Sequence, residues 1–73
     1  MVSRLAELDA ARDRFLALAA EHDRLAERIA ALGEQGKLYQ PDSTALTDEG
    51  RRLTWHSIMI RAQMLAIIRR VTL

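Results

Sequence analysis

Apolar side chains recur in alternating steps of three and four residues along the first half of the chain. The two resulting seams are Leu8, Phe15, His22 and Ile29, and Ala11, Leu18, Leu25 and Leu32. Heptad spacing over four repeats is typical of a helix that packs lengthwise against another helix. We therefore expect one helix over residues 3–33, with the hydroxyl of Ser3 capping its first turn.

A second helix is predicted over residues 47–72. Thr47 is a suitable N-cap, and Asp48 and Glu49 follow it, where the helix dipole favours negative charge. The connection, residues 34–46, is rich in turn-forming residues and long for a hairpin loop, so we expect part of it to form a turn of helix. Three of its apolar side chains are expected to pack over the helix ends: Leu38, Tyr39 and Leu46.

Because a single connection joins the two helices, they are expected to run antiparallel. The predicted fold class is all-α: a coiled-coil-like, antiparallel two-helix hairpin that forms one domain over residues 1–73. Few helix breakers interrupt this pattern, since the chain contains one proline and three glycines.

The second helix is apolar on three sides. Its rows are Leu53, Ser57, Ile60, Met64, Ile67 and Val71; Ile58, Leu65 and Ile68; and Trp55, Met59, Ala62 and Ala66. The first helix can cover only one of these rows. We therefore predict a homo-oligomer, most simply a symmetric dimer that forms a four-helix bundle with the second helices inside. An unlike protein partner is the alternative. The residues expected in the oligomer interface are Phe15, His22, Leu53, Trp55, Ile58, Met59, Ile60, Met64, Leu65, Ile67 and Ile68.

The small size of the chain makes this association important for stability. Domains of about 70 residues usually depend on disulfides, a metal, helix packing or oligomerisation. The chain has 73 residues and no cysteine, which excludes disulfides and thiolate metal sites. His22 and His56 are too distant in sequence to form a local zinc-binding pair. We therefore expect no metal and no cofactor.

Charge and hydropathy disfavour nucleic acid and membrane as partners. The net charge is +1, so no strong global field attracts phosphates. A small nucleic-acid-binding protein using arginines at the hairpin ends is the alternative function, and a surface-lying membrane helix over residues 53–71 is a third. The apolar run 58–68 is too short for a transmembrane segment. The N-terminus lacks the apolar core of a signal peptide, so a cytoplasmic location is expected.

The candidate chemistry is sparse. We interpret His22 as a partly buried neutral histidine that fixes helix register; the alternative is a pH-responsive residue, because burial disfavours the imidazolium. Ser3, Ser43 and Ser57 are each expected to lack a positioned histidine, and no glycine-rich phosphate loop occurs. The predicted function is therefore non-enzymatic: a protein–protein interaction module that acts as a small adaptor, scaffold or regulator.

One sequence pattern resembles a known family. Arg14-Phe15, Leu18, His22, Leu25 and Ile29-Ala30 have the spacing found in the first helix of the small YdcH-like bacterial proteins of unknown function. The second helix of that family commonly carries a Leu-Lys-Asp-Glu-Ile/Met segment. The stretch from Ile60 to Met64 is similar, with Ala62 and Gln63 in place of the acidic pair. The resemblance implies a bacterial helical hairpin and no known chemistry.

Overall fold

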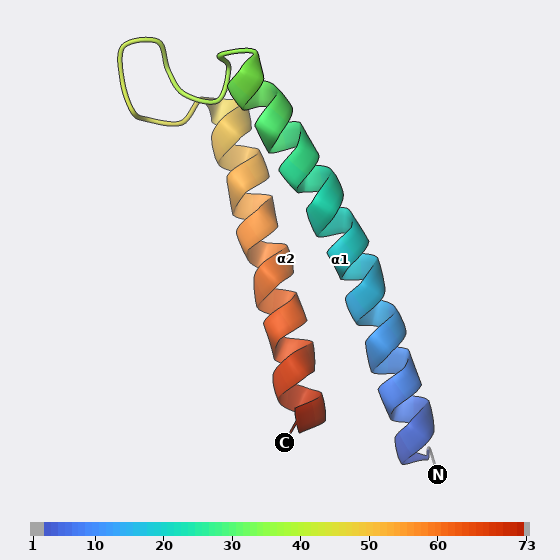
Figure 1. Cartoon of the computed structure of the whole chain (residues 1–73). Coiled ribbons are helices and arrows are strands. Elements are labelled where there is room, and N and C mark those ends of the chain that lie inside the picture. Colours follow the sequence, from blue (N-terminus) through green and yellow to red (C-terminus); the bar gives the residue numbers. More distant parts are fainter. Residues whose placement is uncertain (1–2, 73) are drawn as a thin grey trace.

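The computed structural model describes residues 3–72. They form two helices, α1 (Arg4–Glu34) and α2 (Asp48–Thr72), and the connection between them. The helices lie side by side and antiparallel, and one connection joins them at one end (Figure 1). The chain extends over 57 × 18 × 15 Å. The predicted all-α hairpin is confirmed, and each predicted helix boundary lies within one residue of the observed one. Residues 1, 2 and 73 of the predicted domain lie outside the described residues.

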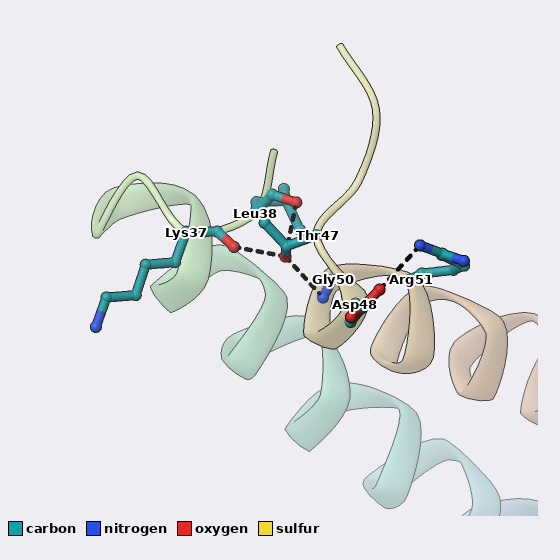
Figure 2. Close-up of polar contacts among 6 residues, drawn as sticks. All are labelled: Lys37, Leu38, Thr47, Asp48, Gly50 and Arg51. Atoms are coloured by element: carbon teal, nitrogen blue, oxygen red, sulfur yellow. Dashed lines mark hydrogen bonds and ion pairs between the residues drawn. The ribbon is translucent and has the colours of Figure 1, made fainter. Parts of the chain in front are cut away.

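Both helices begin where a side-chain oxygen caps the first turn, as the sequence predicts. Ser3 Oγ accepts a hydrogen bond from the backbone N–H of Ala6 at 3.1 Å, and Thr47 Oγ1 accepts one from Gly50 at 3.1 Å. The Thr47 hydroxyl also donates to the backbone carbonyl of Lys37 at 2.7 Å (Figure 2). Thr47 therefore ties the start of α2 to the first residues of the connection.

A glycine in the left-handed conformation follows the C-cap of helix α1. Gly36 has a φ of 69°, and its N–H donates to the carbonyl of Gly33 at 3.1 Å. The N–H of Lys37 donates to the carbonyl of Leu32 at 2.8 Å. These two bonds form a Schellman motif, which satisfies carbonyls that the helix leaves unpaired. A side chain at this position would be strained, so the backbone conformation favours glycine there.

The connection forms a small β-bridged loop. Tyr39 and Leu46 form an isolated antiparallel bridge, and the N–H of Gln40 donates to the carbonyl of Ala45 at 2.9 Å. The expectation of a helical turn here is wrong, because these backbone groups pair across the loop instead. Leu38 packs against the core as expected, whereas Tyr39 is 52% exposed.

The core lies in the half of the hairpin nearest the connection. Its buried side chains are Leu25, Leu32, Leu53 and Ile60, and Leu18, Ile29, Leu38 and Met64 pack against them. Toward the chain termini, the corresponding seam residues Leu8, Phe15 and Ile67 are only partly buried. The hairpin is therefore tightly packed at its closed end and more open at the end that carries the termini.

The predicted seams face each other. Every seam residue of α1 from Leu8 to Leu32 is buried or partly buried, and so is every residue of the first predicted row of α2, Leu53 to Val71. We call this row of α2 the inner row: Leu53, Ser57, Ile60, Met64, Ile67 and Val71. Helix α1 thus covers one row of α2, as predicted from the heptad spacing.

Candidate protein interface

The side of α2 that faces away from α1 is apolar and exposed. Successive helical residues are about 100° apart, so Ala62 lies about 200° around the helix from the buried Ile60. The exposed fractions of the large side chains on this side are 63% for Trp55, 41% for Ile58, 44% for Met59 and 52% for Leu65. Ile68, which is 41% exposed, lies at the edge of this side and also borders a groove between the helices. Together with the exposed alanines Ala62 and Ala66, these five residues are called the outer face below.

The outer face is large for such a small chain. Five side chains of roughly 200 Å² each, about half exposed, present on the order of 500 Å² of apolar surface. Soluble monomers rarely expose contiguous apolar patches beyond a few hundred Å², and larger ones usually mark interaction sites. On α1, the large exposed apolar side chains within the described residues are Leu5 and Leu16, so the apolar surface is concentrated on α2.

The structure divides the predicted interface residues into two groups. Leu53 and Ile60 are only 4% and 2% exposed, because they pack against α1 within the same chain. Four further members lie in the seam and are partly buried there: Phe15, His22, Met64 and Ile67. The other five form the outer face: Trp55, Ile58, Met59, Leu65 and Ile68. The surface open to a second chain is therefore the outer face, and the seam residues hold the hairpin itself together.

A polar pair crosses the middle of the seam. His22 Nε2 lies 3.1 Å from Ser57 Oγ, and both side chains are partly buried. The expectation that Ser57 lacks a positioned histidine is therefore wrong. The helices bring together two residues that are 35 positions apart, and the available sequence signal was that each is a polar residue at a seam position.

The surroundings of this pair give little support to nucleophilic catalysis. Both residues lie inside helices, where backbone N–H groups are bonded along the helix and cannot form an oxyanion hole. The same contact suits a structural role, because a polar pair inside an apolar seam is satisfied in only one register of the two helices. That role of His22, and its alternative as a pH-responsive residue, both stay predictions.

A second cross-helix contact lies beside the first. His56 Nε2 is 3.3 Å from a carboxylate oxygen of Glu21, at the edge of the seam. Both side chains are about half exposed, at 51% and 41%, so solvent screens this pair and its contribution to stability is small. Both contacts join the same turn of α1 to the same turn of α2, because Glu21 and His22 are adjacent in α1 and His56 and Ser57 are adjacent in α2.

A groove of about 590 Å³ lies between the helices at the end that carries the termini. Leu8, Ile67 and Val71 contribute apolar surface to it, and the charged residues that line it are Arg4, Glu7, Arg14 and Arg70. Arg4 also donates a hydrogen bond across the groove to the carbonyl of Val71 at 3.3 Å. A second groove of about 210 Å³ includes Phe15 and Ile68. Both grooves reflect the looser packing of this end.

Three features are not found within residues 3–72. No group of three or more histidine, cysteine, aspartate or glutamate residues there is arranged to hold a metal ion. Neither α1 nor α2 combines the length and the hydropathy that crossing a bilayer requires. No buried side-chain nitrogen or oxygen in this part of the chain lacks a hydrogen-bond partner, so no orphaned polar atom indicates a buried ligand.

Comparison with known proteins returned no relative. No protein-family model, no curated protein and no solved structure matches the chain.

Proposed function

We propose that the chain is a non-enzymatic protein–protein interaction module that self-associates through the outer face of α2. It would act in the cytoplasm as a small adaptor, scaffold or regulator, and a relationship to the YdcH-like bacterial proteins is part of the proposal. The observation that carries it is the row of large apolar side chains exposed on the side of α2 opposite α1. A dimer joined there is a four-helix assembly with both copies of α2 inside.

The area of the outer face is sufficient for association. Burying about 500 Å² of apolar surface contributes on the order of 12 kcal/mol per chain at 25 cal/mol per Å². Association of two chains costs an estimated 4–15 kcal/mol, with further losses from side chains that become ordered. The gain from burying the outer face is therefore of the same order as the costs of association, which is consistent with dimers at the tens of micromolar used in the test below.

Analytical ultracentrifugation tests the proposal on the purified chain. Its mass is 8.3 kDa, and we expect a sedimenting species of at least twice that mass at tens of micromolar. Leu65→Glu places a charge on the outer face and should give a helical monomer. Leu16→Glu is the matched control, because Leu16 is also an exposed leucine, 57% against 52%, but lies on α1. A helical 8.3 kDa monomer of the unmodified chain would refute self-association.

One observation favours nucleic-acid binding as a second candidate. Arg4, Arg14 and Arg70 line a single groove at the end that carries the termini, although Glu7 lies among them. Arginines gathered in this way provide phosphate contacts. Such binding would weaken steeply with salt, by a slope of about 0.9 in log K per phosphate neutralised. Fluorescence anisotropy with duplex DNA and RNA at several salt concentrations tests it, and the absence of salt-dependent binding would exclude it.

A further inference from the structure

The outer face has a centre, and that centre is Ala62. Trp55 precedes it by seven residues and Arg69 follows it by seven, so both lie two helical turns away on the same side of α2. Closer to the centre, Ile58 and Ala66 are four residues to either side. Met59 and Leu65 are three residues to either side in the same way. An antiparallel second copy centred here therefore places each of these residues opposite its counterpart.

We infer that a second copy of this chain docks antiparallel on the outer face, with the twofold axis beside Ala62 and Trp55 stacked on Arg69 of the partner subunit. This inference rests on the proposed self-association and adds its orientation and register. Antiparallel docking places a large side chain against a small one, because Ile58 meets Ala66. It also brings the two Ala62 residues together at the axis, where small side chains allow close helix approach.

Charge favours this orientation over the parallel one. In a parallel dimer, Arg69 would face Arg69 of the partner subunit. Arg51 would also face its own copy, with part of its charge offset by Asp48, which lies 3.0 Å from it in the same helix. Like charges opposed in this way are destabilising, and the parallel helix dipoles add to the repulsion. In the antiparallel dimer, the Arg69 guanidinium instead lies over the indole of Trp55, which is 63% exposed and therefore accessible to it.

The area and its self-complementarity favour a second copy over an unlike protein. Standard interfaces bury about 800 Å² per partner, and about 65% of a homodimer interface is apolar. About 65% of 800 Å² is roughly 520 Å², so the roughly 500 Å² of apolar surface on the outer face corresponds to the apolar part of such a homodimer interface. A symmetric dimer also requires a surface that is complementary to itself, which the pairing about Ala62 provides.

Single cysteines test the register directly, because the chain contains none. Helices packed 8–10 Å apart place facing Cα atoms about 3.5–5.5 Å apart, which overlaps the range that a disulfide spans. Ala62→Cys should therefore cross-link rapidly to its own copy under mild oxidation. Ala66→Cys is the matched control: in the antiparallel dimer its two copies are about 12 Å apart along the axis, so it should not cross-link.

Two further variants complete the experiment: one measures the background rate of cross-linking, and the other is expected to cross-link with Ala66→Cys. Leu16→Cys on α1 measures cross-linking by random collision. A mixture of Ile58→Cys and Ala66→Cys chains should form the mixed disulfide, since these positions face each other across the axis. Cross-linking of Ala66→Cys as fast as that of Ala62→Cys would overturn the antiparallel register. If the chain is a dimer but Ala62→Cys and Ala66→Cys both cross-link no faster than Leu16→Cys, the outer face is not the contact between the two copies.

The contact between Trp55 and Arg69 has its own test. Trp55 is the only tryptophan, so the blue shift of its fluorescence on association follows the dimer directly. Arg69→Gln removes two such contacts per dimer and should raise the dimer dissociation constant by roughly 5- to 30-fold. Arg70→Gln removes the same charge from a neighbouring residue that lines the groove instead, and should leave the constant within about twofold. Equal effects of the two variants would overturn the stacking contact.

These outcomes separate the register from the proposed function. A monomeric unmodified chain refutes self-association itself. A dimer that cross-links with a different pattern retains self-association and refutes only the antiparallel arrangement about Ala62.

Discussion

Gly50 is the residue whose replacement tests the packing of the closed end most sharply. It is buried in the first turn of α2, beneath the backbone of the connection (Figure 2). A Cβ at this position would lie 2.6 Å from the carbonyl oxygen of Leu38 and 3.1 Å from Leu38 Cδ1. Real Cβ atoms essentially never approach backbone oxygen that closely, so the connection must move to admit an alanine.

The carbonyl of Leu38 is held where it is. It accepts a hydrogen bond from the backbone N–H of Thr47 at 2.9 Å, and that bond joins the two ends of the connection. Displacing it weakens a bond worth about 1 kcal/mol, and overpacking of this kind costs about 1–3 kcal/mol. Alanine recovers at most about 1 kcal/mol through its better helix propensity than glycine. The expected net loss for Gly50→Ala is about 1–2 kcal/mol.

Gly33→Ala is the matched control, because it makes the same substitution at the end of α1. The nearest atom to a Cβ there is Leu38 Cδ2 at 3.9 Å, an ordinary van der Waals distance. With no clash, the gain in helix propensity should stabilise the chain by about 0.5–1 kcal/mol. The two glycine-to-alanine variants are therefore expected to change stability in opposite directions.

Thermal unfolding followed by circular dichroism measures both effects. For a chain of this size, 1 kcal/mol shifts Tm by about 4–8 °C, so Gly50→Ala should lower Tm by about 5–15 °C and Gly33→Ala should raise it by a few degrees. All variants must be compared at one chain concentration, because association makes Tm concentration-dependent. A Tm for Gly50→Ala equal to or above that of the unmodified chain would refute the close approach of the connection to α2.

Further substitutions test other parts of the hairpin. Ile60→Glu should unfold the chain, since it buries an unpaired charge at a site that is 2% exposed, whereas Leu65→Glu should retain its helical circular dichroism and lose only association. Gly36→Ala should lower the free energy of unfolding by about 1 kcal/mol, because it forces a side chain into a φ of 69°; chemical denaturation would reveal this. Ser57→Ala should cost about 0.5–1.5 kcal/mol by removing the partner of His22. The cost should largely disappear when His22 is already leucine, and a double-mutant cycle with no coupling energy would show that the 3.1 Å contact contributes nothing.

Local signals in the sequence were sufficient to predict where the two helices lie and which residues cap them. Ser3 and Thr47 each place a side-chain oxygen just before a segment with helical spacing of apolar residues. A cap bonds only to the adjacent turn, so its position can be predicted without knowing any distant contact. The heptad spacing likewise identified which residues of α1 face α2, because side-chain direction follows from position along a regular helix. The same geometry predicted that part of α2 stays uncovered.

Contacts between distant residues were decided only by the tertiary structure. The pairing of His22 with Ser57 depends on how far one helix slides along the other, and periodicity does not specify that register. The bridge from Tyr39 to Leu46 lies within the connection, where turn-forming residues predict a loop but not which of its backbone groups pair. The sequence also grouped Ile60 with Trp55 as interface residues, although one is buried against α1 and the other is exposed. Periodicity shows that a helix has several apolar rows, but only the packed hairpin shows which of them α1 covers, because burial depends on the position of the second helix.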